Sequence, residues 1–102
     1  MIERFAFVKL VPEHATDASR RALAREASET LRPLPGVLAL TVGVPADAEA
    51  AKAWDLCVNV RFATPDDAAA YRSHPVHRRF VDEVIAPRCA ARKGWTFEVE
   101  SG

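Results

Sequence analysis

Apolar and polar residues alternate over four short stretches of the chain, and a spacing of two is typical of β-strands. The clearest stretch runs from Trp54 to Phe62, where alternate apolar side chains share one face. The other three predicted strands span Ile2 to Val11, Val37 to Val44 and Trp95 to Glu100. Pro12 ends the first of these strands, because proline cannot donate to a strand ladder.

A helix is predicted between the first two strands. It begins with Thr16 or Asp17 as the N-cap and runs to Arg32 through good helix formers. Its apolar stripe repeats every four residues and consists of Leu23, Ala27 and Leu31. The segment between the second and third strands, Pro45 to Lys52, is small and polar, which favours a surface loop or a brief helical turn.

A second helical region follows the strand that ends at Phe62. Thr64 is a suitable N-cap and Pro65 suits the first helical position, so we expect a helix from here to Arg72. Pro75 disfavours helical geometry at the residue before it and can start a new helix, with Ser73 or His74 as its cap.

The new helix has an apolar line formed by Val76, Phe80 and Val84. Pro87 lies near its end or in a kink. Residues Arg88 to Lys93 are read as a basic last turn, and Gly94 as the residue that terminates it.

The predicted order is β-α-β-β-α-β, the ferredoxin-like arrangement of an α+β protein. Both helices should cover one face of a four-stranded antiparallel sheet. The opposite face is too apolar to leave exposed to water, since it carries Phe5, Phe7, Ala39 and Cys57. A second copy of the chain is the natural cover, and two such sheets would form a barrel across a homodimer.

Composition narrows the classes of function. A chain of 102 residues is expected to form one domain over residues 1–102. Its 14 Lys and Arg balance 14 Asp and Glu, which argues against nucleic acid and an anionic membrane surface as partners. No apolar run approaches the roughly 20 residues of a membrane span, and no signal-peptide pattern opens the chain, so a cytoplasmic location is expected. Cys57 and Cys89 are expected to be buried small apolar residues in a reducing compartment.

The candidate chemistry lies around Pro75. His77 comes three residues before Phe80, so its imidazole shares the apolar side of the helix. Tyr71 lies across the helix break, and a phenol beside an imidazole can polarise a carbonyl group and move a proton. The plainer alternative is that His77 bonds to a backbone carbonyl and that Tyr71 belongs to the core.

Arg4 is the other candidate, because it shares a strand face with Ala6 and Val8. It either binds a carboxylate or enolate oxygen in a cavity between sheet and helices, or it reaches water from the strand end. A metal site is not expected, since His74 and His77 point differently across the break and no further ligands complete a set. No phosphate loop or nucleophile motif suggests a cofactor.

The chain resembles the stress-responsive A/B barrel family, Dabb, of the dimeric α+β barrel superfamily. The resemblance covers nearly the whole chain, and its most specific motif is Tyr-x-x-His-Pro-x-His at residues 71–77. The weaker landmarks are Phe7-Val8-Lys9, Leu34-Pro35-Gly36-Val37, Val42-Gly43, and Trp54-Asp55-Leu56 through to Phe62.

This resemblance implies a homodimer with a cavity in each subunit between sheet and helices. In the branch similar to plant polyketide cyclases, which need no cofactor, the Tyr and last His of the motif are catalytic and match Tyr71 and His77. That branch has a His on the first strand, where this sequence has Arg4. The positions that match the pocket wall are Ala6, Val8, Val58, Val60 and Phe80.

Three functions follow as alternatives. The first is a dimeric stress-response or small-molecule-binding protein that takes a small apolar or carbonyl compound. The second is a cofactor-independent cyclase or lyase that uses His77 and Tyr71, with Arg4 as the partner of an oxyanion. The third is a cofactor-free monooxygenase of the wider superfamily.

Overall fold

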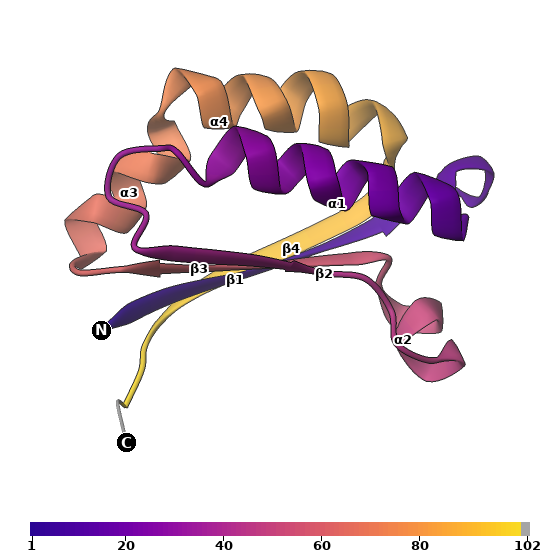
Figure 1. Cartoon of the computed structure of the whole chain (residues 1–102), viewed down its shortest axis with the longest axis horizontal. Coiled ribbons are helices and arrows are strands. Elements are labelled where there is room, and N and C mark those ends of the chain that lie inside the picture. Colours follow the sequence, from indigo (N-terminus) through magenta and orange to yellow (C-terminus); the bar gives the residue numbers. More distant parts are fainter. Residues whose placement is uncertain (101–102) are drawn as a thin grey trace.

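A four-stranded sheet with helices packed on one face forms the body of the protein (Figure 1). The computed structural model describes residues 1–100. The strands are β1 (Ile2–Leu10), β2 (Ala39–Gly43), β3 (Leu56–Phe62) and β4 (Cys89–Glu98). Their order across the sheet is β2-β3-β1-β4, and every neighbouring pair is antiparallel. The predicted ferredoxin-like fold is therefore confirmed.

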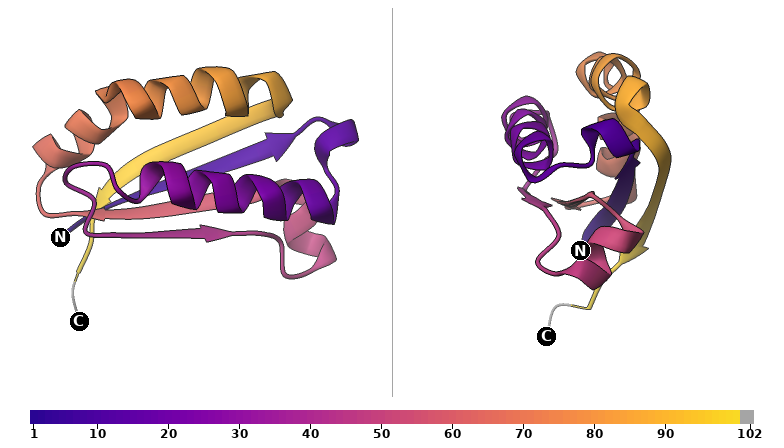
Figure 2. Two further views of the ribbon diagram at one scale, coloured as in Figure 1. Left: turned by 45° about the horizontal axis from the view of Figure 1, so that its top comes forward. Right: turned by 90° about the vertical axis from the view of Figure 1, so that its right-hand side faces the viewer.

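Three helices cover one face of the sheet (Figure 2). They are α1 (Asp17–Leu31), α3 (Pro65–Ser73) and α4 (Pro75–Phe80), and α4 continues into a π-helix (Val81–Ile85) and a 3-10 turn (Ala86–Arg88). A 3-10 turn (Pro12–His14) precedes α1, and the short α2 (Ala48–Ala53) lies beyond the end of β2.

Side-chain caps set the starts of the helices. The Thr16 hydroxyl accepts a hydrogen bond from the Ser19 amide at 3.2 Å, and the Thr64 hydroxyl accepts one from the Asp67 amide at 3.1 Å. His74 Nδ1 accepts a hydrogen bond from the Val76 amide at 3.1 Å and so caps α4. Of the alternatives that the sequence left open, Thr16 and His74 are therefore the caps.

The prediction of a basic helical turn before the last strand was wrong. Residues Arg88 to Lys93 were expected to end a helix at Gly94, but β4 begins at Cys89 and pairs with β1 along its length. The strand ladder outweighs local helix propensity here, because it satisfies the backbone groups of both strands. β4 is an edge strand, and charged side chains are a common protection for such edges.

Two other boundaries also differ from the prediction. Trp54 was placed on the buried face of β3, yet it ends α2, and its ring packs 5.7 Å from that of Phe7 on the opposite face. Leu38 falls within the predicted strand from Val37 to Val44, but it precedes β2 and is 57% exposed. In both places the strand is shorter than the alternating pattern, so the side-chain direction changes where the pairing stops.

A buried carboxylate connects α1 to the sheet. Asp55 is fully buried, and its Oδ2 accepts a hydrogen bond from the Leu10 amide at 2.7 Å. Its Oδ1 accepts one from Arg20 Nε at 2.9 Å, and Arg20 Nη2 lies 2.8 Å from the same oxygen. The sequence pattern gave no sign of this role for Asp55, because periodicity cannot reveal a partner 35 residues away.

The core lies between the sheet and the helices. The expected stripe of α1, Leu23, Ala27 and Leu31, is buried there, together with Phe62, Phe80 and Ile85. The two cysteines were expected in the core, but Cys57 is exposed and Cys89 is half-buried, and both are free thiols. Cys57 pairs with Phe7 across the sheet, and both side chains lie on the face that no helix covers.

That uncovered face of the sheet is apolar, as the sequence predicted. Trp95 and Phe97 are 51% and 53% exposed, and the Phe97 ring packs edge-on against Phe5 at 5.9 Å. Figures 1 and 2 show no helix below this face apart from α2 at one end. Large aromatic side chains at such exposure are typical of interaction surfaces.

Candidate functional site

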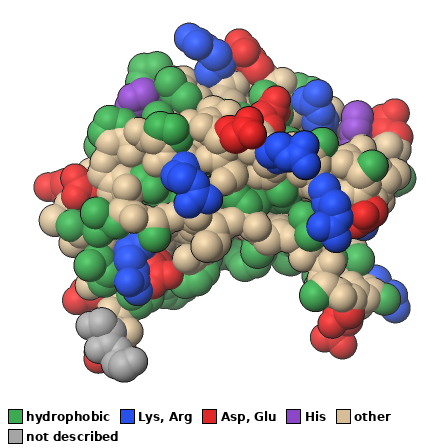
Figure 3. All heavy atoms as spheres, in the orientation of Figure 1, with side chains coloured by type: hydrophobic (Ala, Val, Ile, Leu, Met, Phe, Trp, Pro, Cys, Tyr) green, Lys and Arg blue, Asp and Glu red, His purple; other side chains and the backbone are tan. Residues whose placement is uncertain are grey.

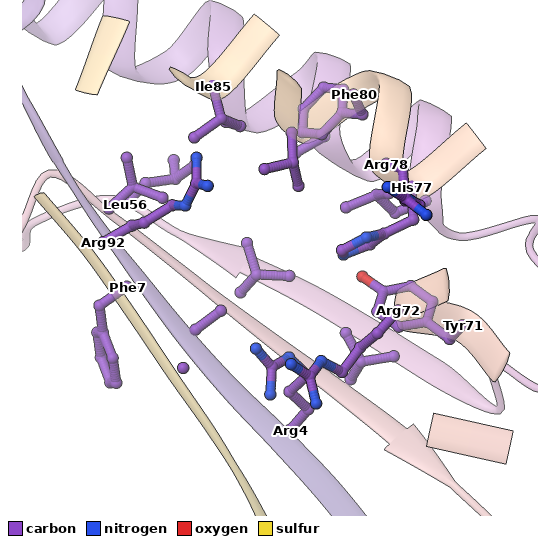
Figure 4. A pocket seen from close by; sticks show the side chains of 18 of the residues that line it. Arg4, Phe7, Leu56, Tyr71, Arg72, His77, Arg78, Phe80, Ile85 and Arg92 are labelled. Atoms are coloured by element: carbon purple, nitrogen blue, oxygen red, sulfur yellow. The ribbon is translucent and has the colours of Figure 1, made fainter. Parts of the chain in front are cut away.

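A cavity of about 390 Å³ lies between the sheet and the helices. Its floor is formed by β1, β3 and β4, and its roof by α1, α3, α4 and the π-helix (Figure 4). Helix α1 contributes Ala27 and Leu31, and the π-helix contributes Val81, Asp82 and Ile85. Most of the wall is apolar, and the polar groups gather at its ends.

All eight residues that the sequence and the family resemblance proposed for a site line this one cavity. They are Arg4, Ala6, Val8, Val58, Val60, Tyr71, His77 and Phe80. They come from β1, β3, α3 and α4, and antiparallel pairing sets Ala6 opposite Val58 and Arg4 opposite Val60. The structure brings these positions together across more than 70 residues of chain.

Tyr71 and His77 are in contact at one end of the cavity. Their ring centroids are 4.6 Å apart in an edge-on arrangement, and the Tyr71 ring also packs 5.1 Å from Phe62. The turn at His74 and Pro75 allows this contact, because α3 and α4 meet at an angle there. In Figure 4 the Tyr71 hydroxyl is directed toward the His77 ring and the open space.

Burial shifts the protonation of both rings. It raises the pKa of the Tyr71 phenol to about 12, although the nearby charge of Arg4 opposes this shift. Burial lowers the pKa of His77, and the charge of Arg4 lowers it further, whereas the Arg72 backbone carbonyl raises it. At neutral pH Tyr71 is therefore a hydrogen-bond donor, and His77 is a neutral imidazole able to accept a proton.

Arg4 lies at the same end of the cavity and is half-buried. Its Nη1 donates a hydrogen bond to the Thr96 hydroxyl at 3.3 Å. The guanidinium group rests on Gly94, where a Cβ would come within 2.5 Å of Arg4 Nη2. Arg4 therefore lies against β4 among the residues that line the cavity.

The family model of the Stress responsive A/B Barrel Domain, Dabb, matches residues 2–99, which is nearly the whole chain. The chain belongs to the Dabb family. A search of the curated proteins found no match to it.

Solved structures share the fold of this Dabb domain at low sequence identity. A Dabb family protein with a ferredoxin-like fold from Mesorhizobium loti superposes with a TM-score of 0.80 at 17% identity, covering 98% of this chain and 97% of that one. A dimeric ferredoxin-like protein of unknown function from Thermobifida fusca has a TM-score of 0.79 at 23% identity, with 96% and 90% covered. A candidate antibiotic biosynthesis monooxygenase from Nitrosomonas europaea has a TM-score of 0.75 at 18% identity, with 97% and 98% covered.

Sequence reasoning missed several residues that line the cavity of this Dabb domain. Three are arginines, namely Arg72, Arg78 and Arg92. Arg92 was assigned to a helical turn, and its true place on β4, opposite Val8, brings it to the cavity floor. Arg72 could have been noticed beside Tyr71, whereas nothing in the sequence pattern points to the π-helix that places Asp82 and Ile85.

Neither a metal site nor a membrane-spanning helix is found in the described part of the chain. No three His, Cys, Asp or Glu side chains within residues 1–100 are grouped so that they could hold a metal ion. Over the same residues, no helix has the length and apolar character needed to cross a bilayer.

The lowered pKa of His77 can be measured directly. We expect the His77 ring protons to titrate in NMR spectra with a midpoint below the ordinary value of about 6.5. The unfolded chain binds this proton more readily, so the free energy of unfolding should fall as the pH drops from about 6.5 through that midpoint. Replacing Arg4 with Met should raise the midpoint, because a neighbouring positive charge is lost.

The resonance is assigned by its loss in His77→Gln. Arg79→Met is the matched control, since Arg79 is exposed on α4 and does not line the cavity. A His77 midpoint at or above the ordinary value would show that the ring is not desolvated as described.

Proposed function

We propose that this Dabb protein is a homodimer that binds a small, largely apolar molecule in the cavity between its sheet and its helices. The proposal rests on the volume and the lining of this cavity. Its volume of about 390 Å³ lies within the range of roughly 300–1,000 Å³ that is usual for small-molecule sites. Apolar walls with a few convergent polar groups are also typical of such sites.

The polar groups at one end would orient the ligand. Tyr71 is 3% exposed, and the structure records no hydrogen bond to its hydroxyl from residues 1–100. A carbonyl oxygen of a ligand in the cavity would accept a hydrogen bond from this hydroxyl, while Val58 and Val60 would contact the apolar part of the ligand. This arrangement favours a ligand with one polar end over a pure hydrocarbon.

A neutral fluorescent probe, N-phenyl-1-naphthylamine, tests binding in the cavity. We expect it to bind the protein, and we expect Ala6→Leu to weaken binding by about tenfold, because the larger side chain occupies space on the cavity floor. The measurement is a fluorescence titration, with circular dichroism to confirm folding. Ala18→Leu, the same change at an exposed position of α1, should leave the affinity unchanged. Equal affinities for Ala6→Leu and the unmodified protein would contradict a ligand site here.

The homodimer would bury the uncovered face of the sheet. Two faces carrying Phe5, Phe7, Trp95 and Phe97 would remove a large aromatic surface from water, which is the main favourable contribution to association. The proteins of the same fold from Thermobifida fusca and Bacteroides fragilis are described as dimeric, which supports the proposal.

Light scattering can test the dimer at micromolar concentration. We expect the unmodified protein to have twice the mass of one chain, and Phe97→Lys to be a monomer, because a charge would be buried in the interface. Ala18→Lys adds the same charge on the helical side and should remain dimeric. A monomeric unmodified protein would refute the proposal.

An enzyme is the second candidate, and the contact between Tyr71 and His77 favours it. A neutral imidazole could remove a proton beside a carbonyl group while the Tyr71 hydroxyl donates a hydrogen bond to the developing oxyanion. The cofactor-free monooxygenase remains a third candidate, and it rests on the shared fold alone.

Deuterium uptake by acetophenone in heavy water tests proton abstraction, followed by loss of the methyl signal in NMR spectra. If the cavity is an active site, the protein should accelerate uptake, His77→Gln should abolish the acceleration, and Tyr71→Phe should reduce it by about 100-fold. Both variants should still bind N-phenyl-1-naphthylamine, which separates lost chemistry from lost binding. An acceleration that survives His77→Gln would exclude His77 as the base.

A further inference from the structure

The charges that line the cavity are unbalanced. Four arginines and Lys93 contribute to its lining, against a single acidic residue, Asp82, and all of these except Arg4 are exposed at its rim. These arginines are Arg4, Arg72, Arg78 and Arg92. The ion pairs recorded within residues 1–100 join Arg20 to Asp55, Arg21 to Asp17 and Arg61 to Glu3, so none of the four is neutralised by a carboxylate. A protein with zero formal net charge has thus concentrated positive charge around this one cavity.

Arg4 is held in place by features of β4. Its partner in the strand register is Thr96, whose hydroxyl accepts its hydrogen bond, and the next residue on the same face is Gly94. A Cβ at Gly94 would collide with the guanidinium group in its present position. The absence of a side chain at Gly94 therefore leaves the space that the Arg4 guanidinium occupies. Gly94 is not at a turn and has no positive φ, and a Cβ there would displace the flexible end of the Arg4 side chain.

Arg72 brings a second positive charge to this end of the cavity. It follows Tyr71 on α3, and Figure 4 shows its side chain directed toward the same region as that of Arg4. The pKa of Arg4 is lowered by burial first and by the charge of Arg72 second. Repulsion between two guanidinium groups is a cost that an anion placed between them would remove.

We propose that the cavity selects a small organic acid with an apolar body, whose anionic group binds Arg4 and Arg72 beside Tyr71. This inference rests on the proposed function, since it names the class of molecule that the cavity would take. The anion accepts hydrogen bonds from the guanidinium groups, which present paired donors in a plane that suits a carboxylate or sulfonate. The apolar body lies over Val58 and Val60, toward Phe80.

The Tyr71 hydroxyl provides a further donor to the same anionic group. Its phenol stays protonated because burial raises its pKa to about 12. The neutral His77 ring brings no opposing negative charge, and the exposed Asp82 lies on the π-helix, away from the α3 end. The end of the cavity near Tyr71 therefore carries positive charge and no carboxylate.

Two fluorescent probes with the same ring skeleton test this selectivity. N-Phenyl-1-naphthylamine is neutral, and 1-anilinonaphthalene-8-sulfonate adds one negative group to it. We expect the sulfonate to bind about tenfold more tightly than the neutral probe, and the preference to shrink as sodium chloride is raised from about 0.01 M to about 1 M. Arg4→Met and Arg72→Met should each remove most of the preference, measured as the ratio of the affinities of the two probes.

Three controls keep the result specific to this site. Arg79→Met removes an exposed arginine of α4 outside the cavity and should keep the full preference. Gly94→Ala should reduce the preference although every arginine is retained, because the added Cβ displaces the Arg4 guanidinium. Ala6→Leu should weaken both probes, and sulfonate binding that survives this change lies outside the cavity and counts against the proposal.

The outcomes separate this inference from the proposed function. If the neutral probe binds and the sulfonate binds no more tightly, the cavity takes small molecules but does not select anions, and only this inference fails. A preference that persists in both Arg4→Met and Arg72→Met overturns it in the same way. If neither probe binds the folded protein, the proposed function fails and this inference fails with it.

Discussion

The carboxylate of Asp55 is the contact on which the arrangement of the protein depends. Asp55 is fully buried. Its carboxylate accepts hydrogen bonds from the Leu10 amide at the end of β1 and from the Arg20 guanidinium on α1. A buried charge is tolerated only when it is paired and hydrogen-bonded, and removing one partner of such a pair typically costs about 3–5 kcal/mol. Asp55 therefore sets where α1 rests on the sheet, and α1 in turn supplies Ala27 and Leu31 to the cavity wall.

Desolvation is the main cause of the shifted pKa values in the cavity. The same burial that raises the pKa of Tyr71 lowers the pKa of His77 and of Arg4, because each shift favours the neutral form of the group. A protonated phenol and a neutral imidazole thus come into contact at pH 7. The positive charges of Arg4 and Arg72 at this end would strengthen any interaction with an anion in a site partly removed from water.

The two faces of the sheet have different surroundings. The inner face packs against the helices and holds the cavity, and the outer face leaves Trp95 and Phe97 about half exposed. Figure 3 shows charged side chains scattered over the helical side, with hydrophobic side chains between them. β4 serves both faces, because alternate residues present Gly94 to Arg4 on one side and Trp95 to Phe5 on the other.

The sequence by itself determined the element order and the helix cap at Thr64. These features depend on local propensity and on periodicity, which short windows of sequence contain. Only the tertiary structure decided that Cys89 to Lys93 are strand, that Asp55 is buried beside Arg20, and that Gly94 leaves the space that the Arg4 guanidinium occupies. These outcomes depend on partners 35 or more residues away. Pairing with β4 satisfies the backbone groups along one edge of β1, which a helical turn at residues 89–93 would leave without partners. Long-range contacts therefore outweighed the local pattern.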